Sequence, residues 1–355
     1  MNYKIVRLKT SGKIGKTASV LIVYTGGTLG MAYDDSGALV PFNFGLILEK
    51  IPILSNLNIA STVISFPEPI DSSNVTTSHW RDMAYIIYEN YDSYDGFVVL
   101  HGTDTMAYSA SMLSYMLHGL NKPVIFTGAQ LPISAMRSDA RENLVTSLEI
   151  ATAKVNGHPI VPEVCIFFNH MLLRGNRAKK VQSIHFDAFE SENYPPLAEA
   201  GIVIDYNTNA IRPFESQKKL VNLNKLDNNV MVLKLFPGIT DKILDSCFAI
   251  PGLKGVVLET YGSGNSPSEA WFMKSLEKAI KKGLIILNVS QCNGGRVIQG
   301  RYETSKELLA VGVVSGADMT TEAAVTKLMF LLGQDYSREE ISAKLTQSIS
   351  GEITA

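Results

Sequence analysis

Short apolar runs rich in β-branched residues alternate along the chain with stretches in which apolar residues recur every three or four positions. The short runs are typical of strands buried on both faces, and the periodic stretches predict helices with one apolar face. In the first half of the chain, this pattern predicts strands at 20–24, 97–100, 124–126 and 164–168, and helices at about 106–120 and 139–155. Asp139 and Glu142 have the spacing of an N-cap pair for the second of these helices.

The alternation stops at 211–228, a polar segment that contains Pro213 and has neither period, and then it resumes. We expect this segment to be an interdomain linker. The later part of the chain has strands predicted at 230–236, 256–259, 284–289 and 311–314, and helices near 239–248 and 269–282. Two helices end the chain, and Ser337 with Glu340 forms a capping-box pattern at the last one. The alternation favours an α/β fold with parallel sheets, and four segments are predicted: a basic extension 1–18, a domain 19–210, the linker 211–228 and a domain 229–355.

Composition narrows the class of protein. The 355 residues fit two domains, and 32 basic against 34 acidic residues give a net charge of −2, which disfavours a nucleic-acid-binding protein. Five of those basic residues and no acidic ones lie in 1–18, so the remainder carries 27 − 34 = −7, and we expect 1–18 to be a solvated extension. The sequence has no apolar run long enough for a secretory signal or a membrane span, and its three cysteines form no CxxC pair. We therefore expect a cytoplasmic protein without a membrane partner, a disulfide framework or a thiolate zinc site.

Ligands of open α/β sheets bind beyond the carboxyl ends of strands, so the turns after the predicted strands are candidate sites. The turn Thr25–Gly30 reads Thr-Gly-Gly-Thr-Leu-Gly and lacks both the dinucleotide and the phosphate-loop glycine patterns. Taken alone, it is best interpreted as a tight turn. The next turn, His101–Thr105, carries one Thr and one Asp more than a helix cap needs. His101 itself is more typical of a hydrogen-bonded core histidine than of a general base.

Three further segments carry polar groups. Arg174–Lys180 has four positive charges, which usually indicates a solvated loop, although a lysine held against a buried aspartate can accept a proton. Asp71–Asn74 offers a carboxylate and two hydroxyls, or else a simple Asx-type turn. Tyr261–Asn265 follows a strand of the second domain and would by default be a flexible turn.

The order of these motifs is more informative than any one of them. Thr-Gly-Gly-Thr, Asp-Ser-Ser-Asn, His-Gly-Thr-Asp-Thr, Arg-Gly-Asn-Arg-Ala-Lys-Lys and Tyr-Gly-Ser-Gly-Asn, in this order, resemble the bacterial-type L-asparaginase family, and most closely its cytoplasmic type I branch. The resemblance covers nearly everything after residue 19. It implies a larger N-terminal α/β domain with a mostly parallel sheet, a smaller flavodoxin-like C-terminal α/β domain, and no metal or organic cofactor. It also implies a homo-oligomer, a dimer or dimer of dimers, with active sites between the N-terminal domain of one subunit and the C-terminal domain of a neighbour.

The resemblance also assigns roles to residues. Thr28 matches the nucleophile of the family, and its catalytic triad of threonine, aspartate and lysine corresponds to Thr103, Asp104 and Lys180. The loop that grips the substrate α-amino and α-carboxylate groups matches Asp71, Ser72 and Ser73, and the residue contributed by the neighbouring subunit matches Asn265. Leu29–Pro41 corresponds to a lid over the substrate, and Ala38-Leu39 lies near the position where secreted relatives have a catalytic tyrosine.

These assignments imply hydrolysis of L-asparagine to L-aspartate and ammonia through a β-aspartyl ester on a threonine. The alternative within the family is an amidotransferase subunit that releases ammonia for tRNA-dependent transamidation; such subunits usually carry an added N-terminal domain, for which Met1–Ala18 is too short. A non-catalytic amino-acid-binding protein would be expected to lack Thr28 or Lys180. Periodicity alone would suggest a nucleotide-binding oxidoreductase, but the glycine fingerprint of that class is missing.

Overall fold

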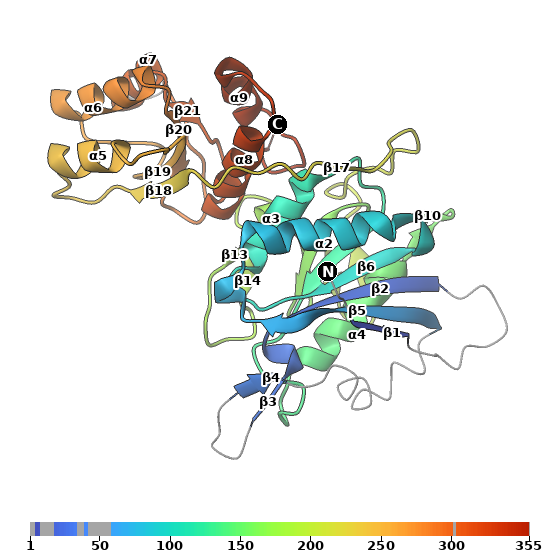
Figure 1. The fold of residues 1–355 in the computed structure, drawn as a ribbon. Helices are drawn as coiled ribbons and strands as arrows, with labels where there is room; N and C mark the ends of the chain where they lie inside the picture. Colours follow the sequence, from blue (N-terminus) through green and yellow to red (C-terminus); the bar gives the residue numbers. More distant parts are fainter. Residues whose placement is uncertain (1–3, 8–17, 34–38, 42–57, 301–302, 355) are drawn as a thin grey trace. The chain divides into compact units, whose positions relative to one another are not determined.

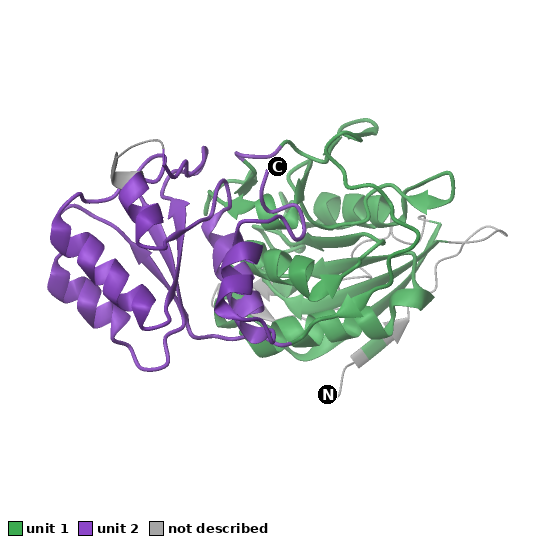
Figure 2. Cartoon of the chain, turned by 90° about the horizontal axis from the view of Figure 1, so that it is seen from above, with its two compact units in different colours: residues 1–191, 195–224 green, residues 192–194, 225–355 purple. Residues whose placement is uncertain are grey.

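The chain folds into two compact units (Figure 2). The computed structural model describes residues 4–7, 18–33, 39–41, 58–300 and 303–354. The first unit comprises residues 1–191 and 195–224, and the second comprises 192–194 and 225–355. The chain therefore passes from one unit to the other three times, and the last passage falls inside the segment expected to be a linker.

A nine-stranded sheet forms the centre of the first unit, in the order β1-β5-β2-β6-β8-β11-β12-β15-β16. Its five middle strands are mutually parallel: β5 (Ile59–Ile70), β2 (Ala18–Gly26), β6 (Gly96–Leu100), β8 (Val124–Thr127) and β11 (Val164–Phe168). The outer strands are antiparallel to their neighbours: β1 (Lys4–Arg7), β12 (Met171–Arg174), β15 (Ala198–Ala200) and β16 (Ile204–Tyr206). Every residue of β6, β8 and β11 is buried, which confirms the prediction of strands covered on both faces.

Helices cover both faces of this sheet (Figure 1): α2 (Thr77–Glu89) and α3 (Met106–Met116) lie on one face, and α4 (Ala140–Thr152) lies on the other. Helix α3 ends four residues earlier than its apolar period predicts, because Leu117–His118 pairs as β7 with β17 (Val221–Asn222). This pairing attaches part of the expected linker to the first unit. The remaining short strands form hairpins: β3 (Met31–Tyr33) with β4 (Leu39–Pro41), β9 (Lys154–Val155) with β10 (His158–Pro159), and β13 (Lys179–Lys180) with β14 (Phe189–Glu190).

Two expectations for the first unit are wrong. Lys4–Arg7 pairs with β5 at the edge of the sheet, so this part of the expected solvated extension belongs to the fold. Asp139 makes no side-chain cap, and its backbone is itself helical. Its carboxylate instead accepts hydrogen bonds from the backbone N–H groups of Gln130 and Leu131, at 3.0–3.2 Å. The loop after β8 leaves these two amides without a strand partner, and the aspartate satisfies them.

The second unit is a four-stranded parallel sheet whose strands follow chain order: β18 (Val230–Lys234), β19 (Gly255–Thr260), β20 (Ile285–Ser290) and β21 (Val314–Ser315). One face is covered by α5 (Asp241–Phe248), α6 (Ala270–Lys281) and α7 (Glu303–Ala310), and the other by α8 (Thr321–Gly333) and α9 (Arg338–Leu345) (Figure 1). The capping box of Ser337 and Glu340 is confirmed at the start of α9. Helix α7 was not predicted, because its eight residues include only three apolar side chains.

A buried ion pair fixes the end of the chain in the second unit. Lys327 and Glu352 are 2.6 Å apart, and both side chains are fully inaccessible to solvent. The ammonium group also donates to the carbonyl oxygens of Leu345 and Gln347, and the carboxylate accepts from the amide of Ser350. Burial lowers the pKa of Lys327, and Glu352 opposes that shift. Because every charge has a partner, the desolvation cost of this pair is offset.

The short segment 192–194 joins the second unit through Asn193. Its side-chain oxygen accepts from Gly295 N at 2.7 Å, and its amide nitrogen donates to Gly295 O at 2.8 Å and Asp318 O at 3.1 Å. A residue that precedes the second unit by some thirty positions is thus part of that unit's hydrogen-bond network. None of the helices in the described part of the chain is long and apolar enough to span a membrane.

Candidate active site

The candidate residues of the first unit gather at one edge of its sheet. Strands β5, β2, β6 and β8 run parallel, so the turns that follow them lie at the same edge. Gly27 has φ +90°, and a Cβ on it would lie 2.6 Å from the backbone nitrogen of Gly102. The Thr-Gly-Gly-Thr and His-Gly-Thr-Asp turns are therefore in backbone contact, which a side chain at Gly27 would prevent.

The Asp-Ser-Ser-Asn turn also packs against Gly102. A Cβ on Gly102 would lie 2.6 Å from Ser72 Oγ, and the Thr105 hydroxyl donates to the Ser72 carbonyl oxygen at 2.7 Å. The carboxylate of Asp71 accepts from Ser73 N at 3.0 Å, which is the Asx-type turn considered above. Ser72 is buried, whereas Asp71 and Ser73 are exposed. Three turns far apart in sequence are thus packed directly against one another.

Thr103, Asp104 and Lys180 are joined by direct hydrogen bonds. Lys180 Nζ lies 2.8 Å from Thr103 Oγ1 and 2.6 Å from Asp104 Oδ1. The lysine side chain is 18% exposed and the aspartate side chain 62%, so the carboxylate is not the buried partner considered from the sequence. The short β13–β14 hairpin places Lys180 here, 77 positions after Thr103 in the chain. A lysine held in this way can exchange a proton with the threonine hydroxyl.

Gln130 is a member of this group that the sequence analysis missed. Its side-chain oxygen accepts from the Thr103 hydroxyl at 3.3 Å, and its amide nitrogen donates to His185 O at 3.0 Å. It therefore links the catalytic candidate Thr103 to the loop that follows Lys180. A signal was available, because Gln130 follows β8, whose carboxyl end shares the edge with β2 and β6.

Thr28 begins a short 3₁₀ turn, Thr28–Gly30, and is half-buried. Among the described residues, its hydroxyl has no hydrogen-bond partner. The Tyr24 hydroxyl, which is buried, reaches the Gly30 carbonyl oxygen at 3.4 Å from below the turn. Burial raises the pKa of Tyr24 to about 12, so this group stays a neutral donor. The turn is thus supported from within the core, and Thr28 presents its hydroxyl at the edge.

His101 is a hydrogen-bonded core histidine, as its position after an apolar strand predicted. Only 1% of the residue is exposed, with Nδ1 2.7 Å from Gly102 O and Nε2 2.9 Å from Ser109 Oγ. Burial lowers the pKa of His101 to about 4, which keeps the ring neutral at physiological pH. Both ring nitrogens are occupied, so His101 is not available as a general base.

The remaining expectations concern Asn265 and the lid. Asn265 lies in the second unit, in a turn closed by two backbone hydrogen bonds between Tyr261 and Asn265. Its side-chain amide has no partner in the described part of the chain. Of the expected lid, β3 and β4 form an antiparallel hairpin in which Tyr33 is paired with Leu39. Ala38 lies outside the described residues.

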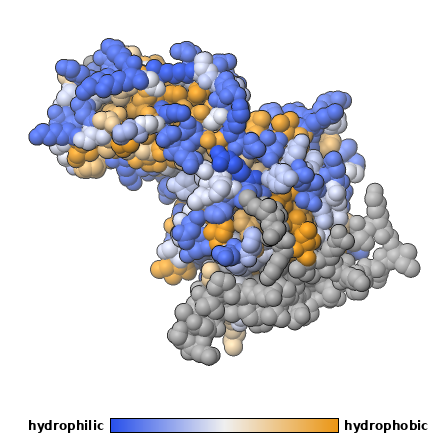
Figure 3. All heavy atoms as spheres, viewed as in Figure 1, coloured by the Kyte–Doolittle hydropathy of each residue, from blue (hydrophilic) through white to orange (hydrophobic). Residues whose placement is uncertain are grey.

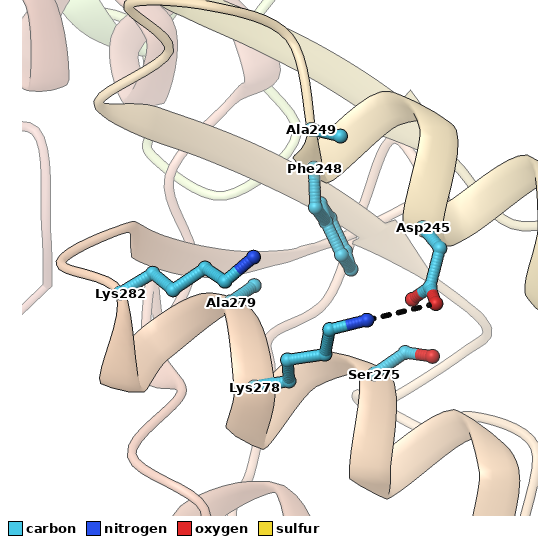
Figure 4. Close-up of a pocket in the computed structure, with 7 residues that line it drawn as sticks. All are labelled: Asp245, Phe248, Ala249, Ser275, Lys278, Ala279 and Lys282. Carbon is cyan, nitrogen blue, oxygen red and sulfur yellow. Dashed lines mark hydrogen bonds and ion pairs between the residues drawn. The ribbon is translucent and has the colours of Figure 1, made fainter.

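A small concavity lies between α5 and α6 of the second unit (Figure 4), where Lys278 reaches Asp245 at 3.3 Å. Hydrogen bonds from Ser275 and then Lys278 lower the pKa of Asp245. The cavity, about 50 Å³, is far smaller than a typical small-molecule site.

On the face drawn in Figure 3, hydrophilic residues dominate the surface of this unit, with apolar patches between them. No group of three His, Cys, Asp or Glu side chains within the described ranges is placed to hold a metal ion.

Known proteins resemble this chain over nearly its whole length. L-asparaginase 1 of Escherichia coli strain K12 is 39% identical over 340 residues, covering 95% of this chain and 98% of that protein. The human 60 kDa lysophospholipase is 40% identical over 96% of this chain, which spans only 62% of the human protein. Among solved structures, L-asparaginase I of Vibrio cholerae superimposes with a TM-score of 0.86 at 38% identity, covering 96% of this chain and all of that one.

Two family models match in succession. Residues 19–212 match the model described as "Asparaginase, N-terminal", and residues 229–345 match "Glutaminase/Asparaginase C-terminal domain". Together they cover more than half of the chain, in agreement with the two α/β units. By these matches, its close relatives and its fold, the chain belongs to the asparaginase family.

Proposed function

We propose that this protein is an amidohydrolase that converts L-asparagine to L-aspartate and ammonia. The observation that carries the proposal is the hydrogen-bonded group of Thr103, Asp104 and Lys180, packed through Gly102 against the turn that presents Thr28. The family and its L-asparaginase members support the same reaction.

Thr28 acts as the nucleophile in this proposal. A threonine hydroxyl is a weak nucleophile until its proton is removed. Lys180 accepts that proton through Thr103 once its ammonium group has passed a proton to Asp104. Attack on the side-chain amide gives a tetrahedral oxyanion, which backbone N–H groups of the Gly26-Gly27 and Gly102-Thr103 turns stabilise. Loss of ammonia leaves a β-aspartyl ester, and water then hydrolyses the ester with help from the same groups.

Substrate recognition falls to the exposed Asp71 carboxylate and Ser73 hydroxyl, together with the buried hydroxyl of Ser72. An α-amino group needs an acceptor such as the Asp71 carboxylate, and an α-carboxylate needs donors such as the serine hydroxyls. Asn265 completes the site from a neighbouring subunit. The active form is therefore a homo-oligomer, either a dimer or a tetramer built as a dimer of dimers. The proposed compartment is the cytoplasm. Because this recognition requires a free amino acid, it favours L-asparagine over the lysophospholipid ester in the human relative's name.

The test compares two substitutions at Thr28. Thr28→Val keeps the shape of the side chain and removes its hydroxyl, and should lower kcat for ammonia release by about 10⁴-fold or more. Thr28→Ser keeps a hydroxyl and should retain measurable turnover. Wild-type-like turnover by the folded Thr28→Val protein would rule out the assigned nucleophile. Steady-state measurements with L-asparagine and L-glutamine give selectivity, since one methylene is worth only about 1–3 kcal/mol.

An amidotransferase subunit would make a different prediction. Such a subunit delivers ammonia to a second active site, and its release should depend on the partner and on charged tRNA. Rapid ammonia release from free L-asparagine by the protein alone therefore separates the two functions. A non-catalytic amino-acid-binding protein would bind L-asparagine without releasing ammonia.

A further inference from the structure

A chain of buried hydrogen bonds runs behind the His-Gly-Thr-Asp turn, from helix α2 through helix α3 to the end of β6. Trp80 Nε1 lies 2.8 Å from Ser109 Oγ, Ser109 Oγ lies 2.9 Å from His101 Nε2, and His101 Nδ1 lies 2.7 Å from the Gly102 carbonyl oxygen. All three side chains are less than 8% exposed. The ring of His101 also packs edge-on against Phe126, with centroids 5.8 Å apart.

The donor and acceptor groups of the partners determine the direction of every hydrogen bond in this series. The Gly102 carbonyl oxygen can only accept, so His101 Nδ1 must carry the proton. The ring is neutral, so Nε2 is unprotonated and accepts from the Ser109 hydroxyl. Trp80 can only donate, and it supplies the remaining hydrogen bond to Ser109. All protons therefore point from Trp80 toward Gly102.

The last hydrogen bond of this series is made to a peptide group of the candidate active site. The Gly102 carbonyl and the Thr103 N–H belong to the same peptide, and a hydrogen bond to the carbonyl polarises the N–H into a stronger donor. Among the described residues, the Thr103 N–H has no hydrogen-bond partner of its own. It therefore remains available to a ligand at the edge where the Gly27 and Gly102 turns are in contact.

We propose that His101 is a positioning residue that acts through the Gly102–Thr103 peptide, orienting the Thr103 N–H and strengthening it as a donor to the oxyanion. The oxyanion itself rests on the proposed function, whereas the tautomer and the polarised peptide do not. His101 touches neither the substrate nor the nucleophile in this role.

The expected size follows from known donors. Removing an oxyanion donor outright costs about 10²–10³-fold in kcat, and one neighbouring hydrogen bond strengthens a donor by about 10–30%. If 10–30% of the donor's contribution to the activation free energy is lost, the 10²–10³-fold effect on kcat becomes about two- to eightfold. This is the loss expected when only the hydrogen bond from His101 is removed. This effect should fall on kcat, because the oxyanion forms after the substrate has bound.

The first measurement uses the unaltered protein. The ¹⁵N spectrum of the His101 imidazole at neutral pH should show the proton on Nδ1 and a bare Nε2. A proton on Nε2 and none on Nδ1 would overturn the inference, because Nδ1 would then have nothing to donate to Gly102. No substrate is needed, so this result stands whatever reaction the protein catalyses.

The second measurement compares His101→Asn with His101→Gln. The Asn amide nitrogen can take the place of Nδ1 and keep the bond to Gly102, whereas the Gln amide takes the place of Nε2 and keeps only the Ser109 contact. Both lose the aromatic contact with Phe126 and keep an amide, and they differ in size by one methylene. We expect kcat of His101→Gln to fall two- to eightfold below that of His101→Asn at similar KM, with an upfield Thr103 amide proton shift only in the Gln variant.

Equal kcat values and equal Thr103 amide shifts in the two folded variants would refute the positioning role. A shifted amide in a protein that does not hydrolyse L-asparagine would support the polarised peptide and refute only the proposed function. If a variant fails to fold, the tautomer measured in the unaltered protein still decides whether the bond exists.

Discussion

Substituting Lys180 by Met should separate catalysis from stability. The lysine contributes one hydrogen bond to Thr103 and one ion pair to Asp104, whose carboxylate is 62% exposed and can be hydrated when the lysine is gone. Such a solvent-screened pair is worth at most about 1 kcal/mol, and the hydrogen bond from the partly exposed ammonium to the Thr103 hydroxyl about another 1. Met retains the apolar stem, so we expect the free energy of unfolding to fall by only about 1–2 kcal/mol.

The rate should fall far more. A positioned proton acceptor contributes about 10²–10⁴-fold, which corresponds to about 3–5 kcal/mol in the activation free energy. The assay is kcat for ammonia release with L-asparagine, together with urea unfolding of the same sample. The outcome that refutes the reasoning is a folded Lys180→Met protein whose kcat lies within tenfold of the parent.

Lys154→Met is the matched control. Lys154 pairs with Asp95 at 2.5 Å, with both side chains about one-third exposed, in the same unit. Asp95 immediately precedes β6, so this ion pair lies at the amino edge of the sheet, opposite the candidate site. The control should lose a similar free energy of unfolding and keep its activity. Equal loss of activity in both variants would indicate a general effect of removing an ion pair.

Three further predictions concern the backbone, the core and pH. Gly27→Ala places a Cβ 2.6 Å from the nitrogen of Gly102 and should lower kcat at least tenfold. The control is Gly238→Ala, at φ +94° with open space around it, which should lower the free energy of unfolding by only about 1 kcal/mol and leave kcat unchanged. Lys327→Met leaves a fully buried carboxylate unpaired and should lower the free energy of unfolding by about 3–5 kcal/mol in denaturant titrations; a loss below 1 kcal/mol contradicts this. The pKa of His101, lowered by burial to about 4 against about 6.5 in an unfolded chain, means that the unfolded state binds the extra proton. This group's contribution of about 3 kcal/mol is complete above pH 6.5 and is lost as the pH falls toward 4, so His101→Asn should flatten the pH dependence of unfolding in that window.

Much of the fold could be predicted because its strands have local signatures. The buried runs at 20–24, 97–100 and 124–126 each form a central strand of the parallel sheet. The capping box at Ser337 is equally local, since its two partners are three residues apart. Predictions failed where a distant partner decides the structure: Asp139 serves a loop nine residues before it instead of its own helix.

The candidate site shows the same division. The turns at Thr28 and Thr103 follow strands that the sequence identifies, so their place at one edge could be foreseen. The sequence could not show that Gln130 bonds to Thr103, nor that Asp104 is exposed, because both depend on side-chain contacts made across the turns. Lys180 reaches the site through two short strands too brief to leave a periodic pattern. The residues alone marked the segment Arg174–Lys180 as a candidate, and only the resemblance to a family singled out Lys180.

The interleaving of the two units has a consequence during synthesis. Asn193 leaves the ribosome 102 residues before its partner Gly295, which at about 5–20 residues per second is a delay of roughly 5–20 s. During that interval, the Asn193 side chain lacks its partners in the second unit, because Gly295 and Asp318 have not yet been made. A fragment beginning at residue 225 would likewise be made without Asn193. The second unit is therefore discontinuous in sequence, and a fragment that contains the whole unit must include residues 192–194.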